Sequence, residues 1–183
     1  MSWERGVLDE AWETLSPAAR GELRTIAEDM EAVRSGPGLP RRAISAPEVL
    51  NEATTYAPIP SSFSRGLRVE LPGAAMVFLS GTSAVDEQGA TVHAGDFAAQ
   101  LMRTYRNLSR LLESEGASWR DVARTTCYLR DIDRDYVTFN RLRTAFFAAM
   151  GIAPLPASTA IQARLCRPDL LVEIEALALV PRP

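Results

Sequence analysis

The sequence is short of the residues that hold metals and form cross-links. It has one histidine, His93, and two widely separated cysteines, Cys127 and Cys166. A zinc site built on several histidines, or a Ser-His-Asp triad with a second histidine in reserve, is therefore close to excluded, and we predict no metal. We expect two reduced, buried thiols, as in a cytosolic protein, and a solvated loop histidine.

Long apolar runs and an excess of basic residues are also missing. No segment approaches the roughly eighteen consecutive apolar residues that a membrane span needs. The first residues, Met1 to Arg5, lack the basic start and apolar run of a signal peptide. The net charge of −3 and the pI of about 5.3 give no electrostatic basis for binding nucleic acid. We expect a cytoplasmic protein that binds neither nucleic acid nor membrane.

A hydrophobic fraction of 46% in 183 residues suits one compact domain with an appendage. Residues 1–50 form that appendage, which we predict to be a helical extension and linker. Ser16-Pro17 is typical of a helix start, and Ser35-Gly36-Pro37-Gly38 of a stop. Between them the apolar residues recur at helical spacing: Ala19, Leu23, Ile26, Ala27, Met30 and Val33.

A shorter helix is predicted over residues 7–15, and Arg41-Arg42 between prolines indicates an extended linker. Two roles stay open for the extension. It packs as an arm on the domain or on a neighbouring subunit, or it acts as an anchor for a partner protein or a lid over a site.

Residues 51–183 alternate between strand and helix patterns. Two strands joined by Pro72-Gly73 predict a hairpin. Two long helices follow, each lying between strands, so both should cover one face of one mixed sheet. The predicted α/β (α+β) order is ββαβαββ, with strands at 67–71, 75–80, 122–129, 158–166 and 170–180 and helices from Asp96 to Gly116 and from 133 to 150.

The helices should bury one face each. The first presents Phe97, Leu101, Met102, Tyr105, Leu108, Leu111 and Leu112, and the second presents Tyr136, Phe139, Leu142, Phe146 and Met150.

The last strand has two different faces. Val172, Ile174 and their alternates should point toward the helices. Glu173 and Glu175 lie among leucines on the opposite face, which the helices leave bare. Self-association is the simplest cover for that face. The two glutamates either pair with arginines such as Arg124 or Arg164, or mark a polar site.

Several segments resemble the RidA/YjgF family. They are Phe78-Leu79-Ser80-Gly81, Gln100 with Asn107-Leu108, Thr125 to Asp131, Phe139-Asn140 with Phe146-Phe147, Pro156-Ala157 and Val172 to Ala176. The resemblance covers roughly 130 residues in the right order. It implies a chorismate-mutase-like fold and a homotrimer with clefts at the subunit boundaries. It also implies deamination of small enamines and imines without a metal or organic cofactor.

The resemblance further implies site residues. Glu173 corresponds to the glutamate that orients the attacking water, Ser80 to a serine at a strand end, and Asn140 to a helix asparagine. The family's carboxylate-binding arginine falls on Ser158, and an upstream tyrosine falls on Phe63.

The loss of that arginine is the main departure, because a guanidinium–carboxylate pair contributes on the order of 1.5–3 kcal/mol. Thr159 is a further polar contact, and Arg130, Arg164 or Arg167 could supply the missing charge.

Two functions are therefore open. One is an enzyme acting on an enamine, imine or enol ether with Glu173 as base, and the other is a non-catalytic binding or regulatory trimer. Tyr128 to Asp131 and Cys166 to Glu175 are also similar to the C-terminal part of chorismatases, which supports chemistry by Glu173.

Overall fold

The computed structural model describes residues 12–33, 38–56 and 61–181. The chain divides into two compact units, Met1–Gly38 and Leu39–Pro183. In the first unit, α2 spans Pro17–Val33, and the Ser16 hydroxyl accepts a hydrogen bond from the backbone N–H of Ala19 at 3.2 Å. The predicted helix start is confirmed. The shorter helix predicted over 7–15 lies mostly outside the described residues.

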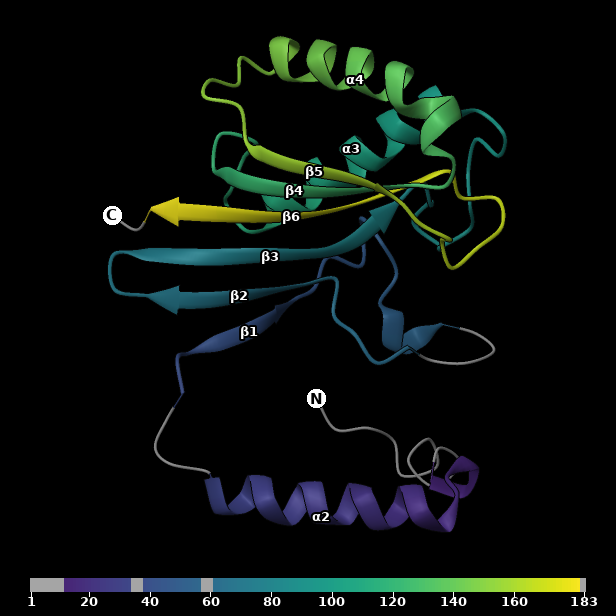
Figure 1. Cartoon of the computed structure of the whole chain (residues 1–183). Coiled ribbons are helices and arrows are strands. Elements are labelled where there is room, and N and C mark those ends of the chain that lie inside the picture. The colour runs from purple at the N-terminus through teal and green to yellow at the C-terminus, as the bar shows by residue number, and fades with distance from the viewer. Residues whose placement is uncertain (1–11, 34–37, 57–60, 182–183) are drawn as a thin grey trace. The chain divides into compact units, whose positions relative to one another are not determined.

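The second unit is built on a mixed sheet (Figure 1). Its described strands lie in the order β1-β2-β3-β6-β4-β5. The pair β4–β5 is parallel and every other pair is antiparallel. The strands are β1 (Arg41–Ile44), β2 (Gly66–Leu71), β3 (Ala74–Ser83), β4 (Val122–Leu129), β5 (Ala157–Gln162) and β6 (Val172–Pro181), and a short 3-10 helix, η1 (Ala53–Thr55), follows β1.

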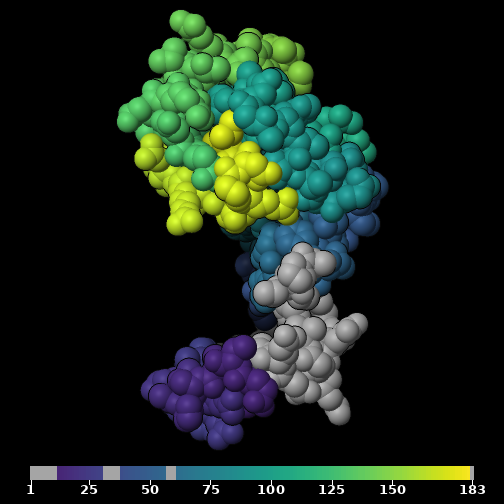
Figure 2. Space-filling view, turned by 90° about the vertical axis from the view of Figure 1, so that its right-hand side faces the viewer, coloured from purple at the N-terminus to yellow at the C-terminus, as the bar shows by residue number. Residues whose placement is uncertain are grey.

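Two helices cover one face of this sheet, as predicted (Figure 1). They are α3 (Phe97–Ser114) and α4 (Ile132–Ala149), and their surfaces adjoin as teal and green atoms in Figure 2. Asp96 and Asp131 cap them, each accepting a backbone N–H at 3.0 Å. The α+β fold class predicted from the sequence is confirmed.

The buried faces differ from the prediction at four residues. Met102, Tyr136 and Met150 were predicted to be buried and are exposed, whereas Phe147 was not predicted to be buried and is. Tyr136 and Met150 are exposed because α4 packs on β4 near the edge of the sheet, so only a narrow stripe of this helix is covered.

The predicted linker is wrong at residues 41–44, which form β1 along β2. Arg42 donates two hydrogen bonds, at 2.9 and 2.6 Å, to the buried carboxylate of Glu115 at the end of α3. The second arginine of this basic pair is thus held by a partner 73 positions away. The compact second unit accordingly begins at Leu39, ahead of the boundary predicted after residue 50.

The last two strands are shorter than predicted, because residues 163–171 form a loop between β5 and β6. Arg164 and Arg167 therefore lie on this loop. Both cysteines are free, and the prediction of burial holds for Cys127 but is wrong for Cys166, which is exposed on the same loop. Among the described helices, none has the length and apolar character needed to cross a membrane.

Candidate active site

Glu173 lies near the start of β6, on the face turned away from the helices. It is in register with Ser83 of β3 on one side and Tyr128 of β4 on the other. The Ser83 hydroxyl donates to the Glu173 carboxylate at 3.2 Å. Gly81 leaves room for this carboxylate, because a Cβ at that position would stand 2.2 Å from Glu173 Oε1.

Burial raises the pKa of the Glu173 carboxyl, and the nearby Glu175 carboxylate raises it further, against the hydrogen bond from Ser83. Within the described ranges, neither Glu173 nor Glu175 has an ion-pair partner. The predicted alternative of pairing with Arg124 or Arg164 is therefore wrong. A partly buried carboxylate without a cation is disposed to exchange a proton.

Helix α3 fixes β3 and β6, the two strands that carry Ser83 and Glu173. The Asn107 amide donates to the backbone carbonyl of Ser83 at 3.0 Å. The Gln100 amide donates to the carbonyl of Asp169 at 2.8 Å and accepts from the N–H of Leu171 at 2.8 Å. Both side chains are buried, so they hold the end of β3 and the entry to β6 at a set distance from the helix.

Glu173 opens into a cavity of about 890 Å³. Two other predicted site residues, Ser80 and Phe63, line the same cavity. Arg65 also lines it, but its guanidinium is buried and donates to the carbonyl of Asn51 at 2.8 Å.

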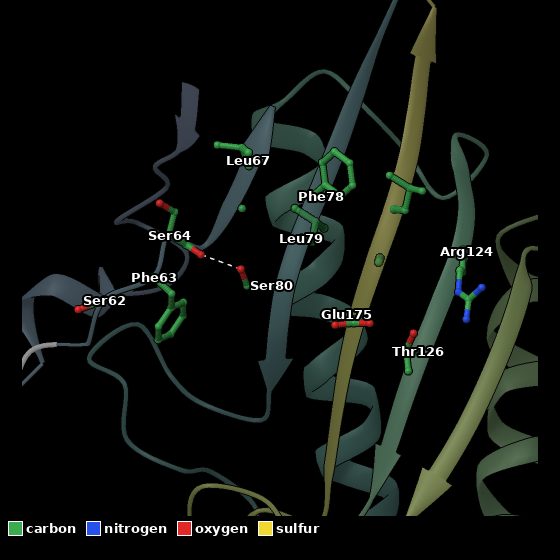
Figure 3. A pocket seen from close by; sticks show the side chains of 13 residues that line it. Ser62, Phe63, Ser64, Leu67, Phe78, Leu79, Ser80, Arg124, Thr126 and Glu175 are labelled. Atoms are coloured by element: carbon green, nitrogen blue, oxygen red, sulfur yellow. Dashed lines mark hydrogen bonds between the residues drawn. The ribbon is translucent and has the colours of Figure 1, made fainter. Parts of the chain in front are cut away.

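A second hollow of about 580 Å³ continues along the same face and shares Phe63, Ser80 and Glu175 with the first. Figure 3 shows the Ser80 hydroxyl donating to the carbonyl of Ser64, a bond of 2.7 Å, with Glu175 on the adjoining strand.

Ser158 lies on the opposite face of the sheet. It is in register with Thr125 of β4, whose hydroxyl donates to it at 3.0 Å on the side that the helices cover. There Arg143 of α4 donates to Ser158 at 3.0 Å and to the Asn140 amide oxygen at 2.6 Å. One chain thus brings Ser158 and Asn140 together but holds them apart from Glu173.

The remaining predicted contacts lie elsewhere. Thr159 is exposed on β5 and accepts a long hydrogen bond of 3.4 Å from Arg124. Arg130 lines neither cavity, since its guanidinium donates to the carbonyls of Leu170 and Arg167 and anchors that loop. His93 is exposed in a loop, as predicted.

The sequence did not single out three residues with side-chain contacts near the predicted site residues. Two of them were not predicted at all, and the third, Arg167, was named only as one of three possible arginines. Arg167 lines the Glu173 cavity and donates to the carbonyl of Gly89 at 2.5 Å. Ser83 and Arg143 carried no signal of their own. Ser83 lies beyond the strand predicted over 75–80, past a register shift between Leu79 and Thr82, and Arg143 depends on how α4 packs on the sheet.

A mixed sheet with two helices on one face is the class of fold seen in solved RidA/YjgF structures. A family model, endoribonuclease L-PSP, matches residues 58–180. The chain belongs to this family, which includes the RidA/YjgF proteins.

Among curated relatives, the 3-aminoacrylate deaminase RutC of Acinetobacter baylyi is 33% identical over 103 residues, which cover 56% of this chain and 78% of the relative. A RutC family protein of Pyrococcus abyssi is 30% identical over 102 residues, covering 56% and 76%. Among solved structures, the YjgF gene product of E. coli is 26% identical with a TM-score of 0.60, covering 77% of this chain and 99% of that one.

Proposed function

We propose that this protein hydrolyses a small enamine or imine in a cleft completed by a second copy of the chain, with Glu173 as the group that orients and deprotonates water. The observation that carries the proposal is the Glu173 carboxylate on the wall of a cavity that Ser80 and Phe63 also line. It has a hydrogen bond from Ser83 but no ion-pair partner among the described residues. The similarity to a protein named 3-aminoacrylate deaminase supports this class of reaction.

The proposed chemistry balances with water alone. Glu173 accepts a proton from the water while the oxygen bonds to the imine carbon. It passes this proton to the nitrogen, which gives a carbinolamine. Glu173 then takes the remaining hydroxyl proton and delivers it to the amino group as the C–N bond breaks, so that ammonia leaves a carbonyl product. A carboxyl whose pKa is raised by burial is a stronger base than an ordinary glutamate, which suits both transfers. We therefore propose no metal or organic cofactor for this step.

We propose a homotrimer as the assembly that completes the cleft. The face that bears Glu173 leaves Phe78 40% exposed and Leu179 48% exposed. In the described sheet β5 pairs only with β4, and Leu155 just ahead of it is 66% exposed. Apolar side chains on an uncovered sheet face indicate an interface.

The bound molecule, in this proposal, is a small metabolite and not a nucleic acid, although the family description names an endoribonuclease. The net charge of −3 supports this choice, since phosphate backbones require a clustered basic surface. The free cysteines suit a reducing compartment, which supports a cytoplasmic site of action.

The test is an assay with imines generated in place by an amino-acid oxidase. Wild-type protein is expected to speed ammonia release, and Glu173→Gln to lose on the order of a hundredfold or more of that activity, the range typical of general acid–base groups. Equal rates for Glu173→Gln and wild type would remove Glu173 from the mechanism.

The replacement of the family arginine by Ser158 favours a second candidate, a binding trimer without catalysis. This candidate predicts that wild-type protein leaves imine decay at the rate of buffer while still binding the carbonyl product. Measuring both quantities on one preparation separates the two functions.

A further inference from the structure

One side of helix α2 is apolar and exposed. Leu23 is 44% exposed, Ile26 54% and Met30 56%. Single exposed apolar residues are common on protein surfaces, but these three stand on successive turns of one helix. They form a continuous apolar stripe, which indicates an interaction surface.

Trp12 lies to one side of this apolar stripe. The guanidinium groups of Arg20 and Arg24 stand over its ring, 5.8 and 5.7 Å from the centroid. At 100° per residue, these two arginines project roughly 90° or more around the helix from the middle of the stripe. The contact with Trp12 therefore leaves the stripe uncovered.

The spacing of the apolar stripe indicates the kind of partner. Ala19, Leu23, Ile26 and Met30 follow one another at intervals of four, three and four residues, which are the a and d positions of a heptad repeat. A helix that packs on a globular domain has a wider apolar face, with a third apolar position in every seven residues. A narrow stripe limited to a and d fits another helix of the same kind.

The residues beside the stripe favour one direction for the partner helix. Glu22 and Asp29 occupy the g positions. In an antiparallel pair the g positions of the two helices face each other, so acid would stand against acid. In a parallel arrangement g faces e, and Glu22 would stand opposite Ala27 of the neighbouring helix without repulsion. The charges therefore favour parallel helices.

The residues of the stripe also favour more than two helices. Leucine at a with isoleucine at d, as in Leu23 and Ile26, shifts the preference to three- and four-stranded coiled coils. In a cyclic trimer every copy has the same direction along the threefold axis, so helices that meet there are parallel. The charge pattern of α2 thus agrees with the symmetry of the proposed assembly.

We propose that α2 is an interface between copies of this chain, and that the three α2 helices of the proposed homotrimer form a parallel coiled coil through Leu23, Ile26 and Met30. The inference rests on the assembly in the proposed function and adds a second contact to it. A helix of 17 residues associates only marginally in isolation. A short link joins α2, which ends at Val33, to β1, which begins at Arg41, so an assembled trimer holds its helices at high local concentration. The role of α2 is then to keep the clefts assembled when the protein is dilute.

The experiment follows the dissociation of the full-length protein by sedimentation velocity over a dilution series. Ile26→Glu places a charge in the apolar stripe, so the protein concentration at half-dissociation should rise at least about tenfold over that of wild type. Thr25→Glu is the matched control, because it adds the same charge at an exposed position of α2 outside a and d. It should dissociate like wild type, and circular dichroism checks that both variants fold.

The direction of the helices is tested with Ile26→Cys, oxidised in the assembled state. Parallel helices in register bring the substituted positions of two copies together. Peptide mass spectrometry should therefore find a disulfide that joins position 26 of one chain to position 26 of another. Thr25→Cys, treated in the same way, should give little of the corresponding product.

The inference is overturned if Ile26→Glu dissociates at the same concentration as Thr25→Glu, the result expected if α2 covers its own sheet domain or binds a different protein. It is also overturned if Ile26→Cys and Thr25→Cys cross-link equally. In either case a trimer that hydrolyses imines leaves the proposed function standing. Dissociation that depends on Ile26, in a protein without imine hydrolysis, supports the coiled coil and removes the proposed function.

Discussion

At the scale of single residues, Glu173 combines a cost in stability with a gain in chemistry. Its carboxylate receives one described hydrogen bond, from Ser83, and sits beside a second carboxylate instead of a cation. Burial without a counter-charge is what raises a carboxyl pKa toward the range useful for proton transfer.

The raised pKa makes a prediction for stability against pH. The folded state holds the Glu173 proton to a higher pH than the unfolded state, so stability falls as pH rises from the ordinary glutamate pKa of about 4.3 through the raised folded value. Glu173→Gln should therefore unfold at higher urea concentration than wild type at pH 7, and the difference should shrink near pH 4. A variant less stable than wild type at pH 7 would indicate that this carboxylate is structural.

Gly81 offers a second test of the same site. A Cβ at this position would collide with the Glu173 carboxylate at 2.2 Å, so Gly81→Ala should displace the carboxylate and lower kcat/KM by at least about tenfold with the fold retained. Gly21→Ala is the control, because nothing lies within 4 Å of a Cβ there. Kinetics together with circular dichroism check both. Unchanged kcat/KM in Gly81→Ala would mean that the position of the carboxylate is not critical.

At the scale of elements, the fold depends on contacts between distant segments that local patterns do not record. Strand β1 is the main case. Arg42 of this strand pairs with Glu115, whose side chain is 3% exposed. The same carboxylate lies 3.6 Å from Arg68 on β2, so one acid ties two strands to the end of α3.

Arg42→Ala should lower the free energy of unfolding by about 1–2 kcal/mol, because the arginine is partly exposed and Arg68 keeps part of the ion pair. Arg41→Ala, the neighbouring exposed position on β1, should change it by less than about 0.5 kcal/mol. Urea denaturation measures both. Equal losses in the two variants would argue against the ion pair as the anchor of β1.

The sequence predictions succeeded for elements that local patterns determine and failed where contacts between distant segments decide the structure. The hairpin, α3, β4 and the two faces of β6 show clear periodicity, so they could be predicted from neighbouring residues alone. The linker prediction failed at β1 because the ion pair that holds this strand joins Arg42 to Glu115, which is distant in the sequence. The cluster around Arg143 could not be predicted, since it requires the rotation of α4 over β5. Glu173, Ser80 and Phe63 were predicted from a resemblance and meet at one cavity, while their roles stay predictions.

At the scale of the whole molecule, the described helices of the second unit, α3 and α4, cover one face of the sheet and leave the other face to be covered from elsewhere. Phe78 is in register with Leu177 on that bare face, at the centre of the sheet. The account requires other copies of the chain to bury it.

Light scattering coupled to gel filtration should therefore give a mass three times the 20.0 kDa of one chain. Phe78→Glu should shift the protein toward the monomer, because a carboxylate would have to be buried without a partner. A wild-type protein that stays monomeric at the concentrations used for activity contradicts the proposed cleft.

The central claim is that Glu173 is the catalytic carboxylate in a cleft that a second copy of the chain completes. It is tested most directly by separating the assembled and monomeric fractions of wild type and of Glu173→Gln by gel filtration and measuring imine hydrolysis in each. Only the assembled wild-type fraction should hydrolyse the imine. Equal activity in assembled wild type and assembled Glu173→Gln, or full activity in the wild-type monomer, would contradict the claim.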